Sequence, residues 1–278
     1  MLERGWEAAL ALSFVRDEAR ARTELHERTH RGPLRVQRPF YPEGGVCHVY
    51  VLHPPGGLVS GDRLSIEVKV EPGAHALLTT PAATKLYRSS GERATQQQRL
   101  RVANGARLEW LPQETIAFDA ARAALSTSIE LTGDARFIGW EILCLGRPAS
   151  DERFERGELA QSIEIARDDR TLYIERGVYA GGGAILDAAW GLAGRPVVGT
   201  FLCAIADAER CLDAARAIAS DASWAPALAA VSCWNDLLVA RYLGASAEQA
   251  RELFTALWRV VRPALMDCPV SEPRIWRT

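Results

Sequence analysis

The chain has 278 residues, of which 48% are hydrophobic and 24% are charged, the composition of an ordinary globular protein with a substantial core. Its net charge of −2 argues against binding to nucleic acid or to an anionic membrane. No segment approaches the run of about 18 apolar residues that a membrane span needs, and residues 1–10 lack a signal-peptide core. We therefore expect a cytoplasmic protein with reduced cysteines, folded as one domain over residues 1–278.

The first part of the chain alternates apolar and polar residues in the way that β-strands do. An alternating segment from His48 leads into the loop Pro54–Asp62, whose prolines and glycines restrict the backbone to a specific path. Leu64–Val70 alternates strictly and predicts a half-buried strand. Gly73 separates it from another predicted strand over Ala74–Thr80.

Three segments predict antiparallel hairpins, because alternating apolar residues flank a turn. The hairpins and their turns are residues 98–111 with Asn104-Gly105, residues 162–175 with Asp168-Asp169, and residues 228–243 with Trp234-Asn235-Asp236. In the second hairpin, Ile163 and Ile165 would face Leu172 and Ile174. Phe137–Leu145 is continuously apolar and suits a strand buried on both faces. With about ten or more short strands, a sandwich, a barrel and a β-solenoid all stay open.

The last quarter of the chain changes to helical periodicity. Asp207–Ser220 places apolar residues at helical spacing behind an acidic first turn. Ser246–Arg262 is the stronger helix, because Ser246 can cap its first turn together with Gln249. Pro263 would end this helix.

The familiar cofactor and catalytic motifs do not fit this chain. Gly56–Asp62 lacks the lysine of a phosphate-binding loop, and Gly181–Gly183 lies in β-rich surroundings rather than between a strand and a helix. There is no nucleophile elbow and no paired-cysteine zinc motif. Adjacent residues on a strand point to opposite faces, so Cys47 and His48 would not share one ion, and we expect no tight metal site. The loose metal-donor candidates are Cys47, His48, His53 and His75.

Several carboxylates occupy apolar stretches of sequence. Glu114 follows Trp110–Gln113, and Glu141 and Glu175 stand within or directly after apolar strand segments. Such charges are paired, hydrated in a cavity, or functional, unless they simply face solvent. Together with Asp62, these three glutamates suggest a polar line through a β-scaffold. Carboxylate oxygens along a wet channel would pass a divalent cation without trapping it, because water completes the coordination shell.

Several long motifs follow one another in the order found in a single family, from about residue 5 to the C-terminus. They are GPLRVQRPFYPE (32–43), CHVYVLHPPGG (47–57), TKLYRSSG (84–91), LEWLPQETIAFDAA (108–121), GWEILCLGRPA (139–149) and PRIW (273–276). In these motifs the chain resembles the urease accessory protein UreD, also called UreH. It departs at Ser60, where the family commonly has glycine, and carries Thr84 where serine is also common.

The resemblance implies a mainly β, solenoid-like scaffold with two helices in the C-terminal quarter, and a role that is not enzymatic. It implies a metallochaperone scaffold for nickel urease that binds apo-urease on one side and UreF on another, with UreG recruited through UreF. It leaves open a dimer of heterocomplexes. It also implies a water-filled internal tunnel that carries nickel in transit, with no stably bound cofactor, and it assigns GTP chemistry to UreG.

Three positions match tunnel-associated residues of the family: Asp62, Thr84 and Glu175. Of these, Asp62 and Glu175 would contact nickel transiently. Glu114 and Glu141 join the proposed path from the sequence itself rather than from the resemblance.

The helical C-terminal quarter is the predicted surface for UreF, with Arg274, Trp276 and Arg277 adding contacts. Alternatively, these helices close the open end of the β core, because an unpaired sheet edge must be covered. The alternative function is a purely structural interaction protein that remodels apo-urease without conducting metal. A hydrolase that uses Asp62 and a nearby carboxylate is a third possibility, and it predicts turnover by the isolated chain.

Overall fold

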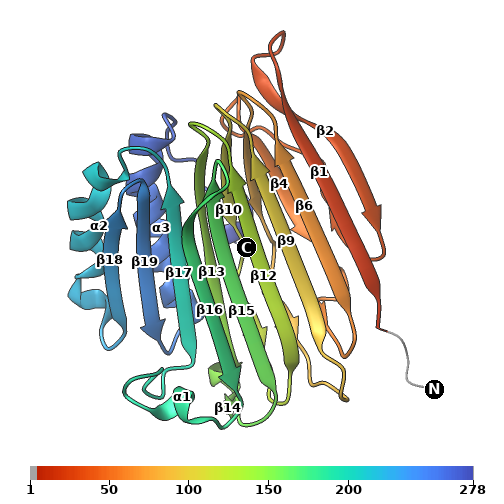
Figure 1. The fold of residues 1–278 in the computed structure, drawn as a ribbon, viewed down its shortest axis with the longest axis vertical. Helices are drawn as coiled ribbons and strands as arrows, with labels where there is room; N and C mark the ends of the chain where they lie inside the picture. The colour runs from red at the N-terminus through yellow and green to blue at the C-terminus, as the bar shows by residue number, and fades with distance from the viewer. Residues whose placement is uncertain (1–4, 278) are drawn as a thin grey trace.

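Two β-sheets face each other in this chain, of which the computed structural model describes residues 5–277, apart from the side chain of Arg277 (Figure 1). The first sheet has the order β16-β15-β12-β9-β6-β1-β2, and the longest path through the second is β18-β19-β17-β13-β10-β7-β4-β3. The first sheet consists of β1 (Glu7–Asp17), β2 (Arg22–Arg31), β6 (Arg63–Val70), β9 (Ala94–Val102), β12 (Arg122–Leu131), β15 (Glu158–Arg167) and β16 (Arg170–Ala180). The second consists of β3 (Arg35–Val36), β4 (Cys47–Leu52), β5 (Gly57–Leu58), β7 (His75–Thr79), β8 (Thr84–Leu86), β10 (Arg107–Leu111), β11 (Thr115–Ala117), β13 (Arg136–Arg147), β14 (Glu152–Arg153), β17 (Val197–Ala204), β18 (Leu228–Trp234) and β19 (Leu237–Gly244).

The central strands form a parallel solenoid. The chain alternates between the sheets, so that β6, β9, β12 and β15 are parallel neighbours in the first sheet. Strands β4, β7, β10 and β13 are parallel neighbours in the second sheet. This arrangement confirms the solenoid-like β-scaffold and removes the sandwich and barrel alternatives.

The predicted hairpin over residues 98–111 is wrong. The turn at Asn104-Gly105, where Gly105 has a φ of +71°, carries the chain from β9 in the first sheet to β10 in the second. Each strand then pairs with the strand one coil away, so these neighbours in sequence do not pair with each other. Turn chemistry fixes a reversal of the chain, but it does not choose the pairing partner.

The other two hairpins are confirmed as β15–β16 and β18–β19. Asp168 and Asp169 both take positive φ at the first of these turns. A register irregularity after Ile165 places Tyr173 opposite Ile165, rather than the apolar neighbours that the alternation predicted. Glu175 consequently lies opposite Ile163, and its side chain faces the second sheet.

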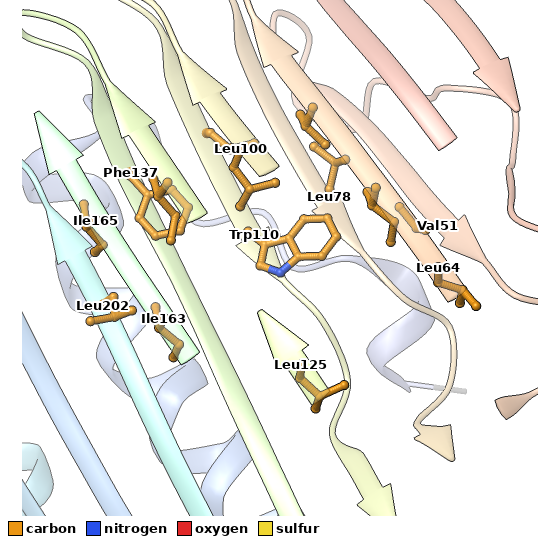
Figure 2. Close-up of a cluster of buried hydrophobic side chains, with 14 of the residues drawn as sticks. Val51, Leu64, Leu78, Leu100, Trp110, Leu125, Phe137, Ile163, Ile165 and Leu202 are labelled. Atoms are coloured by element: carbon orange, nitrogen blue, oxygen red, sulfur yellow. The ribbon is translucent and has the colours of Figure 1, made fainter. Parts of the chain in front are cut away.

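The interior between the sheets holds the main hydrophobic core. Alternate residues of each strand point inward, and Figure 2 shows the resulting cluster around Trp110. The labelled side chains come from strands of both sheets: Val51, Leu64, Leu78, Leu100, Trp110, Leu125, Phe137, Ile163, Ile165 and Leu202.

The two longest helices, in the C-terminal quarter, cover the outer face of the second sheet (Figure 1). Both predicted C-terminal helices exist, as α2 (Leu212–Ala219) and α3 (Ala247–Leu265). The first is shorter than predicted, because its opening turn is a 3₁₀ helix. The short helices are α1 (Ala184–Asp187) and the 3₁₀ turns Pro148–Ser150, Ala208–Cys211, Ala222–Trp224 and Arg274–Arg277. Among residues 5–277, no helix combines the length and apolarity that crossing a membrane would require.

Helix α3 begins as predicted and ends later than predicted. The Ser246 side chain accepts a hydrogen bond from the Gln249 N–H, which confirms the N-cap. Pro263 lies inside the helix, which continues to Leu265. The final turn persists because the Met266 N–H bonds to the Arg262 carbonyl and the Arg262 side chain is anchored in the protein interior.

Candidate functional site

A cavity lined by both polar and apolar side chains lies between the two sheets, beside the hydrophobic core. Its volume is about 110 Å³, enough for several water molecules. Two lining residues carry buried atoms without a hydrogen-bond partner among residues 5–277, His53 Nδ1 and Trp110 Nε1. Buried polar atoms need partners, so this lining suits water or a hydrated ion. Other polar lining residues are Thr80, Thr84, Gln96, Gln98, Gln113, Ser126, Thr127, Glu141 and Gln161.

Glu141 is the carboxylate of this cavity, and it points from β13 toward the first sheet. It accepts hydrogen bonds from Thr127 Oγ1 and, at 2.7 Å, from Gln161 Nε2. Burial raises the pKa of Glu141; the two hydrogen bonds oppose this rise, and the charge of Glu175 adds to it. Glu141 keeps some accessible surface because it lines the cavity.

Strand register continues this polarity from Glu141 toward the protein surface. In the second sheet, Glu141 lies opposite Thr200 of β17, and Thr200 lies opposite Arg241 of β19. In the first sheet, Thr127 and Glu175 belong to one row, with Ile163 between them. Register partners point to the same face of a sheet, so the two rows meet across the interior. Gln98 is the register partner of Thr127, and Gln161 and Tyr173 donate hydrogen bonds to Glu141 and Glu175. We call the polar and charged residues of the two rows, together with these three, the polar seam: Gln98, Thr127, Glu141, Gln161, Thr200, Glu175, Tyr173 and Arg241.

Glu175 forms the outer end of the polar seam. Its carboxylate accepts hydrogen bonds from Tyr173 Oη at 2.8 Å and from Thr200 Oγ1 at 3.1 Å, and it forms an ion pair with Arg241. Burial and the charge of Glu175 raise the pKa of Tyr173. The side chain of Glu175 is 12% exposed and that of Arg241 is 47% exposed, so the seam meets solvent at Arg241.

Thr84 and Glu114 lie near each other but differ in their relation to the cavity. Thr84 lines the cavity, and its N–H donates to the Glu114 carbonyl at 2.9 Å. The Glu114 carboxylate turns to α3 and forms an ion pair with Arg251 at 3.2 Å. The structure therefore places Thr84 and Glu141 on one cavity, and Thr200 connects Glu141 to Glu175. The charge of Glu114 is neutralised by Arg251 and does not line the cavity.

Asp62 is buried behind the cavity wall rather than in it. Its two carboxylate oxygens accept hydrogen bonds from the Trp6 N–H and the Val59 N–H, each at 2.8 Å. These bonds fix the glycine-rich loop, in which Gly61 takes a φ of +80°. His53 connects Asp62 to the cavity: burial lowers the pKa of His53, and the charge of Asp62 opposes this shift.

The C-terminal tail packs against the core through Trp276. Its ring lies 5.6 Å from those of Trp140 and Trp258, and its Nε1 donates to Thr79 Oγ1 at 3.1 Å. Arg274 is exposed, and the Arg277 side chain lies outside the described part of the chain. Trp276 thus anchors the tail, and the partner-binding role of these residues stays a prediction.

A second buried polar cluster joins α3 to the second sheet. The Glu109 side chain on β10 is fully buried and lies 2.8 Å from His75 Nε2. It also accepts hydrogen bonds from Trp258 Nε1 at 2.6 Å and from Arg262 Nε at 3.0 Å. Burial would raise the pKa of Glu109, but His75 and the charge of Arg262 lower it to about 2.

Arg262 extends this cluster to Glu43, with an ion pair of 2.7 Å, and Glu43 lies 2.6 Å from His48 Nε2. Ligand atoms of His75, Glu109 and Cys268 lie within 4.8 Å of one another, in the arrangement of a possible metal site. Arg262 already neutralises Glu109, however, and a cation would have to displace it. The cluster is therefore an ion-pair lock that stabilises the docking of α3.

Sequence reasoning missed the neutral and basic members of the polar seam. They are Gln98, Thr127, Gln161, Tyr173, Thr200 and Arg241. A signal was present in Ala94–Val102, where Gln96 and Gln98 occupy the inward positions that Ala94 and Leu100 fill with apolar side chains. Polar residues on the inward phase of a strand indicate a polar interior, but they do not say which groups meet there.

The fold and the site together define a β-solenoid scaffold whose hydrophobic interior contains a row of polar side chains. The match to a family model, described as UreD urease accessory protein, spans residues 7–277. The chain belongs to the UreD family of urease accessory proteins.

Relatives named "Urease accessory protein UreD" align over nearly the whole chain. The one from Dechloromonas aromatica (strain RCB) is 48% identical over 278 residues, which cover 98% of this chain and 95% of the relative. The one from Azoarcus sp. (strain BH72) is 49% identical over 276 residues, which cover 99% of this chain and 95% of the relative. A role as a urease accessory protein implies interaction with urease and with other accessory proteins.

Proposed function

We propose that this chain acts in nickel urease maturation as a scaffold that binds apo-urease and UreF, with UreG bound through UreF, and that its polar seam conducts nickel. The observation that carries this proposal is the link from Glu141, which lines the cavity, to its register partner Thr200, whose hydroxyl donates to Glu175 near the surface. The link to urease in this proposal rests on membership of the UreD family. The whole chain would act as one domain in a dimer of heterocomplexes.

The chemistry of the seam suits transit better than storage. Its groups are carboxylate, amide and hydroxyl oxygens, whereas Ni²⁺ prefers imidazole among protein ligands. A cation that keeps most of its water would be attracted by Glu141 and Glu175 without being trapped. Burial raises the pKa of Glu141, so a cation that binds there also favours the loss of its proton.

The entrance of the nickel path would lie at the part of the cavity that is lined by the loop Thr80–Thr84 and His53. Nickel entering there would pass from His53 to Glu141 and then along the seam to Glu175. Asp62 would act on this route through the charge it places beside His53 and through the loop that it holds in position.

Conservative substitutions in the seam test the proposal. Glu141→Gln and Glu175→Gln remove charge with little change in shape, and Glu164→Gln on the exposed face of β15 is the matched control. Each variant is co-expressed with urease and its accessory proteins, and nickel per urease active site is counted. We expect the seam variants to lower nickel loading about tenfold or more and the control to match the wild type.

The same preparations separate the two candidate functions. Co-purification of urease and UreF with each variant checks that the complexes still form. Full nickel loading with both seam variants would refute conduction and favour the purely structural alternative, in which only surface changes that break the complex matter.

A further inference from the structure

Arg241 forms an ion pair with Glu175, the carboxylate at the outer end of the polar seam. Its Nη1 forms the ion pair with Glu175 and lies 3.5 Å from Thr200 Oγ1, and its Nη2 donates to Tyr173 Oη at 2.7 Å. Glu175 also accepts bonds from Tyr173 and Thr200. The oxygens that a cation would use are therefore all engaged in this arrangement.

The guanidinium of Arg241 excludes a cation by competition and by charge. A divalent cation bound to Glu175 would stand within a few ångströms of a fixed positive charge, and at such distances the repulsion exceeds thermal energy even near a protein surface. Unlike the fully buried Arg262, Arg241 is 47% exposed and can leave its carboxylate.

The neighbourhood of Arg241 leaves space for this movement. Its register partner on the edge strand β18 is Ala230, a short and exposed side chain. The flanking outward residues Leu228 and Ser232 are exposed as well, so this face of β18 is uncovered. The Arg241 guanidinium also lies 6.0 Å from the centre of the Tyr173 ring, and beyond that contact the uncovered side of Ala230 leaves it a route into solvent.

We propose that Arg241 is a gate residue that keeps divalent cations from Glu175 until its ion pair opens. This inference rests on the proposed nickel path and adds its regulation. Arg241 acts here as a positioning residue, because it sets the affinity of Glu175 for a cation without binding the cation itself. An acidic side chain of a docked partner protein would compete with Glu175 for Arg241 and so open the ion pair.

Nickel binding to the full-length chain tests the gate directly, by equilibrium dialysis against Ni²⁺. We expect Arg241→Gln to bind nickel about tenfold more tightly than the wild type, a change of about 1.4 kcal/mol, because the positive charge beside Glu175 is gone. Arg241→Lys should keep the wild-type affinity, and the double variant with Glu175→Gln should return to it. The matched control is Arg259→Gln, whose ion pair with Glu272 has a similar exposure of 52% and 15%.

Tyr173→Phe provides a second variant, because without changing any charge it removes the hydroxyl that anchors Arg241 and that donates to Glu175. It should raise nickel affinity by less than Arg241→Gln. Unchanged affinity in Arg241→Gln, or a gain that survives in the double variant, would overturn the gate. Failure of the nickel path is a separate result, namely full urease loading with Glu141→Gln and Glu175→Gln, whatever dialysis gives for Arg241.

Discussion

Replacing Arg262 with methionine should destabilise the protein strongly, because it leaves two buried carboxylates without their counter-charge. The Arg262 side chain is 0% exposed and binds Glu109 at 3.0 Å and Glu43 at 2.7 Å. Removing one partner of a buried ion pair costs about 3–5 kcal/mol. For a chain of this size, where 1 kcal/mol corresponds to about 2 °C, we expect the melting temperature to fall by about 5–10 °C.

The pH dependence of this loss identifies its cause. In the wild type, the pKa of Glu109 is about 2, below its ordinary value of 4.5, so the stability from this group is present above pH 4.5 and is lost as the pH falls through about 2. Without Arg262, burial dominates and the pKa of Glu109 rises. Protonation at mild acidity then relieves the unpaired charge, and the deficit of Arg262→Met should be smaller at pH 5 than at pH 8.

Thermal and urea unfolding, followed by circular dichroism at both pH values, measure these differences. Arg259→Met is the matched control, because Arg259 lies one turn earlier on α3 and its side chain is half exposed. The control should lose less than about 1 kcal/mol. Equal losses in the two variants at pH 8, or a deficit at pH 5 as large as at pH 8, would refute the ion-pair lock.

Three further substitutions test other parts of the structure. Burial raises the pKa of Glu141, so ionisation of this carboxylate destabilises the fold as the pH rises above 4.5. The variant Glu141→Gln should therefore have a higher melting temperature than the wild type at pH 8, and this gain should shrink toward pH 4.5. Ser246→Ala removes the N-cap of α3 and should cost about 1 kcal/mol in urea unfolding, and no loss would contradict the cap. Gly146→Ala should cost more than about 1 kcal/mol, because Gly146 has a φ of +88° and a Cβ there would lie 2.4 Å from the Glu152 carbonyl oxygen; a neutral result would show that β14 can shift.

Local sequence predicted the elements better than their partners. Strict alternation located β6, and the cap at Ser246 located the start of α3. The hairpin over residues 98–111 failed because a solenoid coil and a hairpin share the same turn and the same alternation. Pro263 failed as a stop because tertiary anchoring of Arg262 outweighs one missing backbone hydrogen bond.

The candidate site was predictable only in part. Glu141 and Glu175 stood out as charges in apolar sequence, and the structure places both on the polar seam. Asp62 stood out equally, yet its carboxylate binds the main chain behind the cavity wall. Sequence neighbourhood reveals that a charge is unusual, whereas its hydrogen-bond partners depend on segments far away in the chain.

Motif order and hydrophobic period are local properties of the chain, so they were enough to identify the family, the β-rich body and the two C-terminal helices. That Thr200 and Arg241 complete the seam begun by Glu141 and Glu175 became visible in the folded chain alone. These residues meet through the register of antiparallel strands and through the packing of one sheet on the other. Register and sheet packing are set by the sum of many contacts along each strand, so no single segment encodes them.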